Sequence, residues 1–508
     1  MSACNNPIRM MQDDTSAEFE FVDYLTCASR LAESFHGAGY VEIAEAIALQ
    51  YVVAGQLEQA VEQAEQIPDA YVRDSVFAIV TAKAVAAGRD DDATELLNTI
   101  EEPILHNSAV EGMSIEFARR GEFDTALGLT DELSDNASAL GSIAIIYWQH
   151  DLKDEAVDLA RSIDITQQSA MTLAQLASLS SDKDESLNLL AEAREVAEDI
   201  ESAELKVFTL TAIASVYEKL AEREHCLDAL NHAFEVCDDF ESGSLIGLSA
   251  NFPKDEALLE IVQGLLRLDD LSKATEVADA IDDQFLFARA NLGLAVARGK
   301  GEPGEAEKYL DEAMAIISEL QPYSEQEAAV LDALIIDLAM SYANSGNYDK
   351  PRRIVPSVRS EENQRLALTQ LGKLCAGTGD DSGVLKIEGD LRGPYDKVQY
   401  WLGIYDASSS HPELSESALT KALANAEGLE QPVEKSEAFT EIALRFAKSQ
   451  RTARAESLFR AATGAVSLID GNFLKARALL HLAKASQDTG REPNQDEQRL
   501  LEEMMNRV

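Results

Sequence analysis

Basic residues are scarce in this 508-residue sequence, which has 43 Lys and Arg against 91 Asp and Glu and a formal net charge of −48. Nucleic acids and anionic membrane surfaces attract proteins through basic faces, so this shortage argues against both kinds of partner. Long apolar runs are missing too, since no stretch approaches the roughly 18 consecutive apolar residues that a membrane-spanning helix needs. The N-terminus also lacks the basic region and apolar run of a secretory signal, so we expect a cytoplasmic protein without membrane insertion.

Cysteine and proline are also few. The five Cys residues are odd in number and scattered, which is typical of free thiols in a reducing compartment and not of a disulfide framework. Only 12 Pro interrupt the chain, which leaves room for many unbroken helices. Hydrophobic residues make up 46% of the sequence, so a core can form in spite of the acidic excess.

We take the acidic residues to be spread over the whole chain, and such a spread favours a halophile's composition. Self-repulsion among so many negative charges destabilises a compact chain at low ionic strength. At molar salt the screening length falls to about 3 Å and most of this repulsion disappears. The alternative is an acidic protein that recruits basic partners. We expect stability to rise between low salt and molar KCl.

A regular repeat runs through much of the sequence. Gly55, Gly88 and Gly121 are evenly spaced, and each is followed by Ala at the fifth position and an aliphatic residue at the twelfth. Similar columns follow Asp151 and Asp269, with Ala at the fifth position and Ile at the twelfth. Gly346 and Gly379 are separated by the same interval and have Val358 and Leu391 at their twelfth positions. Several columns that agree at one period indicate a repeat protein.

Each repeat is explained by two helices joined at the Gly or Asp. An apolar run at helical spacing precedes the turn, and Gly or Asp tolerates the left-handed backbone that ends a helix. A shorter helix follows, and its Ala lets the two backbones approach. No segment alternates with period 2, so the sequence predicts an all-α superhelix of about thirteen antiparallel hairpins. We expect a flexible tail over 1–15, one array over 16–250 and a second over 251–508 that ends in a capping helix.

The turns resemble those of the tetratricopeptide repeat (TPR). Gly121-Glu122-Phe123-Asp124-Thr125-Ala126 and Gly346-Asn347-Tyr348-Asp349 are similar to that family's Gly-x-aromatic-Asp-x-Ala turn. The family's first-helix Trp and closing Pro are missing here, and a HEAT-like or other hairpin array remains an alternative. The resemblance implies a superhelix whose first helices line a concave groove for a protein segment.

The same resemblance implies which residues face the groove, because its positions are counted back from each turn. They include the apolar Ile115, Ile145 and Trp148, which would suit an amphipathic helix or an extended segment. The alternative is that these side chains only pack between neighbouring repeats. The full set of candidate groove residues is Glu45, Ile115, Arg119, Ile145, Trp148, Gln149, Gln263 and Arg267.

Motifs for cofactors, metals and catalysis have simpler interpretations. Residues 299–304 read Gly-Lys-Gly-Glu-Pro-Gly, but a dinucleotide fingerprint needs a preceding strand, and here a helical segment precedes it. We therefore expect a turn there and no cofactor. His225, Cys226, His232 and Cys237 are too far apart around and along a helix to share one tetrahedral metal ion. Only two Trp are present as sugar platforms, so a glycosidase site is not indicated.

One stretch reverses the overall charge. Residues 435–460 have six Lys and Arg and only three Glu. This stretch is either a docking patch for acidic groups or a set of ordinary solvated charges with intrahelical pairs.

Taken together, the sequence predicts a non-catalytic scaffold that binds a protein or peptide partner in the groove. A regulatory repeat protein that senses a ligand is the alternative, and an α/α-toroid enzyme is a third possibility.

Overall fold

The computed structural model describes residues 22–240, 252–301 and 306–507, and these residues form 27 α-helices, two short 3₁₀ segments and no strand. The predicted all-α class is therefore confirmed. The contacts divide the chain into two units. Unit 1 comprises Met1–Ala54 and Glu430–Val508, and unit 2 comprises Gly55–Leu429.

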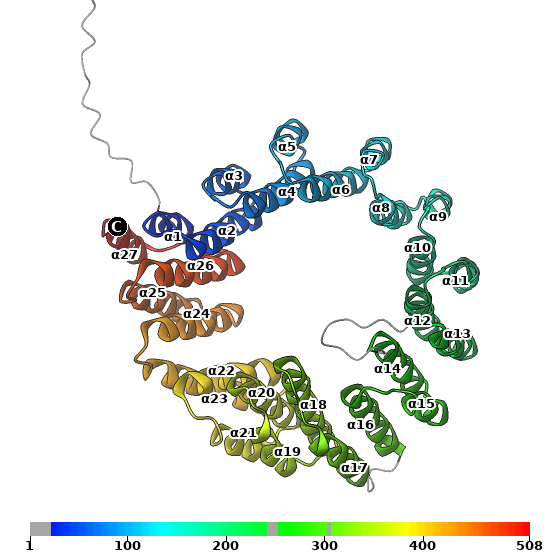
Figure 1. Cartoon of the computed structure of the whole chain (residues 1–508). Coiled ribbons are helices and arrows are strands. Elements are labelled where there is room, and N and C mark those ends of the chain that lie inside the picture. The colour runs from blue at the N-terminus through cyan, green and yellow to red at the C-terminus, as the bar shows by residue number, and fades with distance from the viewer. Residues whose placement is uncertain (1–21, 241–251, 302–305, 508) are drawn as a thin grey trace, which may run out of the picture. The chain divides into compact units, whose positions relative to one another are not determined.

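Unit 2 consists of paired antiparallel helices of 6 to 20 residues (Figure 1). In chain order they are α3 (Leu57–Glu65), α4 (Ala70–Ala86), α5 (Asp90–Leu97), α6 (Pro103–Arg119), α7 (Phe123–Thr130), α8 (Ala137–Gln149), α9 (Lys153–Arg161), α10 (Thr166–Leu179), α11 (Lys183–Glu198), α12 (Ala203–Lys219), α13 (Arg223–Val236), α14 (Phe252–Arg267), α15 (Leu271–Ala278), α16 (Gln284–Gly301), α17 (Ala306–Glu319), α18 (Glu325–Asn344), α19 (Asp349–Ile354), α20 (Glu361–Thr378), α21 (Asp381–Glu388), α22 (Pro394–Ala407) and α23 (Pro412–Glu427).

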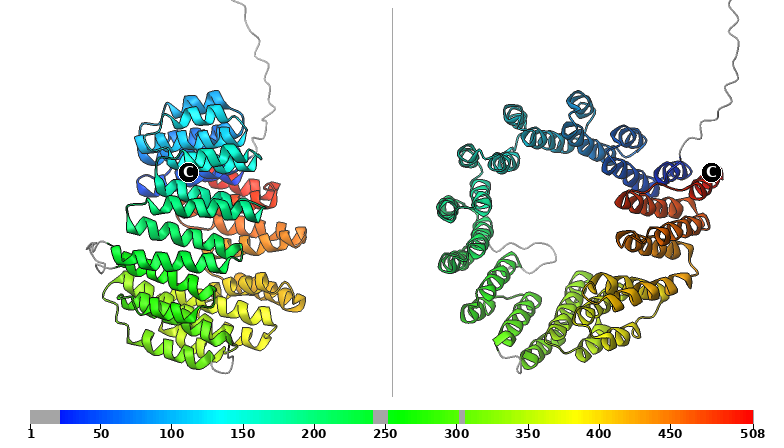
Figure 2. Two further views of the ribbon diagram at one scale, coloured as in Figure 1. Left: turned by 90° about the vertical axis from the view of Figure 1, so that its right-hand side faces the viewer. Right: turned by 180° about the vertical axis from the view of Figure 1, so that it is seen from behind.

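These helices form two rows. Each even-numbered helix from α4 to α20 packs on the next even-numbered helix. The odd-numbered helices pack on the even-numbered ones and make no comparable contacts with one another. The even-numbered helices contact one another, so they lie closer together than the odd-numbered helices do. Unit 2 therefore bends with the even-numbered helices inside (Figure 1, Figure 2). We call them the inner row and the odd-numbered helices the outer row.

The turns between paired helices have the backbone that the repeat predicts. Gly88, Gly121 and Gly346 have φ of 74°, 82° and 89°, and Asp151 and Asp269 have φ of 63° and 59°. This left-handed conformation reverses the chain after an inner helix, and Gly and Asp adopt it most easily. The turn residues expected from the sequence are therefore confirmed.

The columns that follow the turns form the contact between the two rows. The Ala at the fifth position, including Ala60, Ala93 and Ala126, has no exposed surface. Most of the aliphatic residues at the twelfth position, such as Ile67 and Ile100, are buried as well. Because a buried Ala lets helices approach closely, these columns hold each outer helix against the inner row.

Buried aspartates connect successive inner helices in three places. Asp74, Asp255 and Asp332 have carboxylates that accept hydrogen bonds, at 2.8–3.2 Å, from the backbone N–H groups of the two residues that immediately precede the next inner helix. These N–H groups lie in the connection that leads into the helix, so each carboxylate fixes the point at which the next inner helix begins. Each aspartate precedes the turn residue of its own hairpin by the same number of positions, so the three form a further column of the repeat.

Unit 1 brings together the first and last helices of the described chain. Its helices are α1 (Tyr24–Ala32), α2 (Ala38–Val53), α24 (Pro432–Lys448), α25 (Thr452–Ser467), α26 (Asn472–Thr489) and α27 (Gln495–Met505). Helix α1 packs on α26 and α27, and α2 packs on α26. The sequence predicts contacts between neighbouring hairpins only, so it missed this pairing of segments from opposite ends of the chain.

The expected capping helix is present as α27, but its polar face is partly covered. Leu501 and Met504 are buried, and Leu500 is half-buried. Glu497 is fully buried too, where its carboxylate accepts hydrogen bonds from Tyr24 of α1 at 3.2 Å and from Arg491 at 2.5 Å. A helix that ends an array needs a solvated outer face. In unit 1, α1 covers part of that face.

Three predictions fall wholly or mainly outside the described residues. The tail over 1–15 lies outside them, and so do residues 241–251, where the two predicted arrays meet. The division of the array near residue 250 therefore stays a prediction. Of the Gly-Lys-Gly-Glu-Pro-Gly segment, Gly299–Gly301 end α16, residues 302–304 lie outside the description, and α17 begins at Ala306. The segment thus follows a helix and not a strand.

Candidate protein-binding surface

The structure places seven of the eight candidate groove residues on inner helices of unit 2. Ile115 and Arg119 lie on α6, and Gln263 and Arg267 lie on α14. Ile145, Trp148 and Gln149 lie on α8, whereas Glu45 lies on α2 of unit 1 and is half-buried. The eight residues therefore form separate groups along the chain and not one site.

Among the residues of α6 and α8, Trp148 is buried, Ile115 and Ile145 are half-buried, and Arg119 and Gln149 are exposed. Trp148 is only 7% exposed, and Lys153 Nζ lies 4.7 Å from the centre of its ring. Ile145 is half-buried against the same core cluster. Arg119 is exposed and forms an ion pair with Glu116 of its own helix. For Trp148 the structure therefore favours the packing interpretation, because little of the ring remains for a partner.

Gln263 and Arg267 lie together in a hollow of about 260 Å³ between α12 and α14, which we call the α12–α14 hollow. Its other polar groups come from Thr211, Ser215 and Glu218 of α12 and from Glu260 of α14. Its complete lining is Phe208, Thr211, Ala212, Ala214, Ser215, Glu218, Cys226, Leu230, Glu260, Gln263, Gly264 and Arg267.

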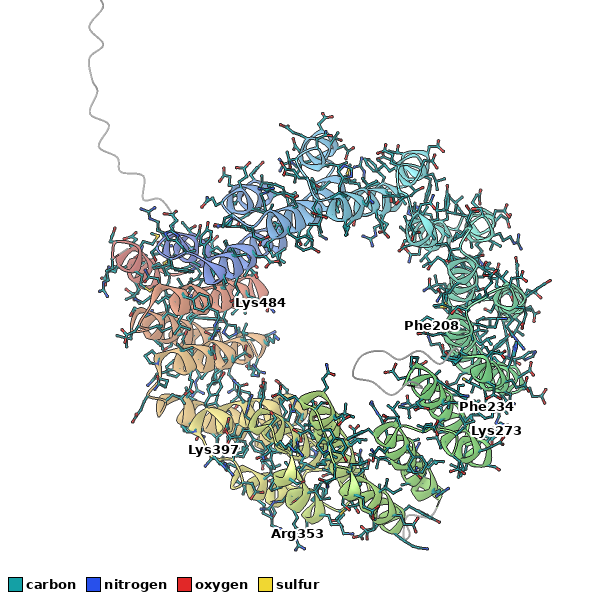
Figure 3. The ribbon with its side chains drawn as sticks, viewed as in Figure 1. Phe208, Phe234, Lys273, Arg353, Lys397 and Lys484 are labelled. Carbon is teal, nitrogen blue, oxygen red and sulfur yellow. The ribbon has the colours of Figure 1, made fainter. Side chains whose placement is uncertain are left out.

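The α12–α14 hollow has an apolar entrance and a closed floor. Phe208 is 51% exposed and lies on the inner side of α12, away from the outer row (Figure 3). Cys226 and Leu230 of the outer helix α13 form buried parts of the floor. A Cβ atom on Gly264 would lie 3.0 Å from Leu230, so glycine allows this close approach of α13 and α14.

Helical spacing explains why α12 contributes so many groups. Phe208, Thr211, Ala212 and Ser215 follow one another at intervals of three, one and three positions, which places them on one face of the helix. At one end of the hollow, Arg267 Nε donates a hydrogen bond to Glu218 Oε2 at 2.9 Å and links α14 to α12. The repeat register did not include α12, because its turn residue is Ala221, which is left-handed with φ of 59° but is not a typical turn residue.

The chemistry of the α12–α14 hollow is that of a binding surface. Glu218 is neutralised by Arg267, and burial raises the pKa of the Cys226 thiol to about 11, so neither is a poised catalytic group. The hydroxyls of Thr211 and Ser215 donate to the backbone carbonyls of Phe208 and Ala212, so they can accept hydrogen bonds from a partner, and the amide of Gln263 can both donate and accept. The hollow therefore combines an apolar contact at Phe208 with polar groups, the ion pair of Glu218 and Arg267, and the carboxylate of Glu260.

The four residues that look like metal ligands by composition have separate surroundings. His225 stacks on Tyr217 with 5.2 Å between ring centres, whereas His232 Nδ1 lies 3.3 Å from Glu198. Cys226 and Cys237 are buried in the core. Across the described ranges, no three His, Cys, Asp or Glu side chains gather in an arrangement that could hold a metal ion.

Several basic residues of the 435–460 stretch have partners within unit 1. Arg445 forms an ion pair with Glu441, and His481 of α26 contacts the same carboxylate at 3.0 Å. These hydrogen bonds lower the pKa of Glu441 to about 2, with His481 as the largest cause. Arg454 lies 5.6 Å from the ring centre of Phe446. Much of the stretch thus consists of charges that are already satisfied within the unit.

Comparison with known proteins identifies no family. No family model matches the sequence, and no curated protein matches it. Among solved structures, Ton1535 from Thermococcus onnurineus NA1 is 17% identical and covers 73% of this chain and 98% of its own, with a TM-score of 0.26. Aspartyl phosphate phosphatase F from Bacillus subtilis is 11% identical over 78% of this chain and 93% of its own, with a TM-score of 0.29. Human IFIT1, solved as a dimer with PPP-AAAA, is 12% identical and covers 87% of this chain and 95% of its own, with a TM-score of 0.29.

These TM-scores are too low to support an argument, so the assignment rests on the chain's own helices and turns. They form an array of antiparallel helical hairpins whose turns have the register of the TPR-like pattern. In the described part of the chain, no helix combines the length and the apolar character that crossing a membrane requires.

Proposed function

We propose that the chain is a non-catalytic scaffold that binds a segment of a partner protein along the inner row of unit 2, at the α12–α14 hollow. The observation that carries this proposal is the half-exposed Phe208 at the entrance of a hollow whose lining also offers hydrogen-bonding groups from Thr211, Ser215 and Gln263. An exposed aromatic ring beside such groups is typical of the centre of a protein interface.

The size of the hollow supports a segment of a protein more than a small ligand. Its volume of about 260 Å³ is below the range of roughly 300–1,000 Å³ that is usual for small-molecule sites. One apolar side chain of a partner fits the hollow beside Phe208, while its backbone meets Thr211, Ser215 and Gln263. The pair of Glu218 and Arg267 closes one end and fixes the direction in which a segment can continue.

The test begins with partners captured from the protein's own cell extract in molar KCl, where the acidic chain is screened. We expect Phe208→Ala to weaken binding of a captured partner about tenfold, which corresponds to about 1.4 kcal/mol. Tyr323→Ala is the matched control, because Tyr323 is also an exposed aromatic residue but lies just before α18. Unchanged binding by the Phe208 variant, or an equal loss in both variants, would contradict the proposal.

A further inference from the structure

A second hollow lies on the outer row, between α3 and α5. Both helices pack on α4 and make no substantial contact with each other. The space between them has a volume of about 340 Å³, similar to that of about ten water molecules. We call it the α3–α5 hollow. Its lining is Leu57, Glu58, Val61, Glu62, Glu65, Val80, Ala84, Arg89, Asp92, Glu95, Leu96 and Thr99.

The floor of the α3–α5 hollow is apolar. Leu57 of α3 and Val80 and Ala84 of α4 are buried beneath it. Val61 of α3 and Leu96 of α5 are half-buried and face each other across it from the two outer helices. An open apolar floor of this kind gains free energy when an apolar side chain covers it, at roughly 25 cal/mol per Å².

The rim of the α3–α5 hollow is acidic. It carries five carboxylates, three from α3 and two from α5. Its single base, Arg89, is already paired with Glu58 at 3.1 Å and with Asp92 at 2.6 Å. The other three carboxylates, on Glu62, Glu65 and Glu95, form no ion pair with any residue of the described ranges.

An acidic rim is not a general property of gaps in the outer row. The corresponding hollow between α11 and α13 has a volume of about 320 Å³ and includes the basic Arg194 and the imidazole of His225 in its lining. Tyr217 takes part in its floor. The combination of an aliphatic floor with unpaired carboxylates on both sides therefore distinguishes the α3–α5 hollow from its neighbour of similar size.

We propose that the α3–α5 hollow binds a basic amphipathic segment of a partner protein. An aliphatic side chain of that segment covers Val61 and Leu96, and Lys or Arg residues three or four positions away reach Glu62, Glu65 and Glu95. This spacing places the apolar and basic side chains on adjacent parts of one helical face. The surface is on the opposite row from the α12–α14 hollow, so binding here does not depend on the inner row.

The test uses synthetic peptides as probes and fluorescence anisotropy as the measurement. The probe is an amphipathic helical peptide of Leu and Lys, and the control peptides replace every Lys by Glu or every Leu by Ala. We expect the Leu/Lys peptide to bind and both control peptides to bind at least tenfold more weakly. Binding is measured at about 0.15 M and about 1 M KCl, where the screening length falls from about 8 Å to about 3 Å. Equal binding of the Leu/Lys and Ala/Lys peptides would overturn the proposal, since attraction to net charge alone would explain it.

Variants of the protein locate the site. We expect the double variant Glu62→Gln and Glu95→Gln to weaken binding of the Leu/Lys peptide about tenfold at the lower salt, and Val61→Asn to weaken it at both salt concentrations. Glu224→Gln with Glu235→Gln on α13 removes the same charge elsewhere and should leave binding within twofold. The glutamine variants change only exposed side chains, so they test the site even if Val61→Asn fails to fold. Equal losses in both double variants, or no loss in the first, would overturn the proposal, whereas Phe208→Ala should have no effect on this peptide.

Discussion

Buried aspartates are the residues on which the packing of successive inner helices most visibly depends. Asp74, Asp255 and Asp332 have at most 3% of their surface exposed, and each satisfies two backbone N–H groups just before the next inner helix. Burial raises the pKa of Asp255, and the N–H groups of Asp283 and Asp282 oppose this effect. A buried carboxylate is tolerated because these donors replace water.

Removing one of these carboxylates should destabilise the fold. We expect Asp332→Ala to lower the free energy of unfolding by about 1–3 kcal/mol, because two buried backbone donors lose their partner. Urea unfolding in molar KCl, followed by circular dichroism, measures the change. Asp91→Ala, at an exposed position in the first turn of α5, is the control and should change stability by less than about 0.5 kcal/mol. Equal stability of the Asp332 variant and the native chain would refute the role assigned to this column.

Glu441 provides a prediction about pH. Its pKa is lowered to about 2 from an ordinary value of 4.5, because His481 and Arg445 bind the charged carboxylate in the fold. A lowered pKa means that the folded state prefers the ionised form, so this contribution is fully present above pH 4.5 and is lost as the pH falls towards 2. We expect Glu441→Gln to lower stability at pH 7 by about 1–3 kcal/mol and to reduce the loss of stability between pH 5 and 3. Parallel unfolding curves of the variant and the native chain across this pH range would contradict the prediction.

Two turn residues carry a backbone strain that glycine would relieve. Ala221 and Gln450 are left-handed, with φ of 59° and 61°, at positions where other repeats have Gly or Asp. We expect Ala221→Gly to raise the free energy of unfolding by about 0.5–1 kcal/mol. A left-handed alanine costs roughly 1–2 kcal/mol, and glycine removes this cost. Part of the gain is offset because glycine makes the unfolded chain more flexible, so folding costs more backbone entropy. Ala87→Gly is the matched control, since Ala87 has φ of −86° and should lose stability on substitution. A loss of stability in both variants would show that Ala221 is not strained.

At the scale of helices, the sequence predicted the hairpins best where the turn residue has a physical preference for its conformation. Between Gly55 and Asp151 the positions of the turn, the buried Ala and most of the buried aliphatic residues all follow from the register of the repeat. Leu133, at the twelfth position after Gly121, is only half-buried.

The register was lost where Ala221 and Gln450 form the turns, because neither residue type signals a left-handed backbone. For the same reason, the sequence predicted the residues that α14 contributes to the α12–α14 hollow but not those of α12. Gln263 and Arg267 were counted back from Asp269, whereas Phe208 had no recognisable turn to be counted from.

The pairing of α1 with α26 and α27 could not be predicted from the repeat, because it joins segments that no local pattern relates. Its polar centre is Glu497, held by Arg491 and Tyr24, with Thr463 within 3.2 Å of the tyrosine hydroxyl. The pKa of Tyr24 is raised to about 12, mainly because the hydroxyl is buried. The tyrosine therefore remains a neutral donor to the carboxylate at physiological pH.

This pairing can be tested by removing the central carboxylate. We expect Glu497→Ala to destabilise unit 1 by about 3–5 kcal/mol, because the buried Arg491 loses its partner. Amide hydrogen exchange should accelerate in α1 and in α27 together, although they lie at opposite ends of the sequence. Glu456→Ala, at an exposed position of α25, is the control. Faster exchange in α27 alone would show that α1 does not depend on it.

At the scale of the whole chain, the acidic excess is not uniform, and the sequence-based prediction was wrong on this point. Residues 55–429 have 29 Lys and Arg against 71 Asp and Glu, whereas residues 430–508 have 12 of each. The repulsion that salt would relieve is therefore concentrated in unit 2. The balanced C-terminal segment includes the basic 435–460 stretch, which is paired with Glu441 and Asp496.

The uneven charge sharpens the prediction of salt dependence. We expect the free energy of unfolding to rise by several kcal/mol between about 0.05 M and 1 M KCl, with the largest gain in amide protection in unit 2, because its like charges become screened. Hydrogen exchange at the two salt concentrations, read separately for residues 55–429 and 430–508, measures this difference. Equal gains in both segments would contradict it, and a stability insensitive to salt would remove the halophile interpretation altogether.

The central claim is that the inner row of unit 2 binds a protein segment at the α12–α14 hollow. Its most direct test is photo-crosslinking with benzoylphenylalanine in place of Gln263, in molar KCl and in the presence of a partner captured by the native chain. The same group in place of Glu235 on the outer helix α13 is the control. We predict a cross-link to the partner from position 263 and none from position 235. Cross-linking from position 235 alone, or from neither position while the partner stays bound, would contradict the account.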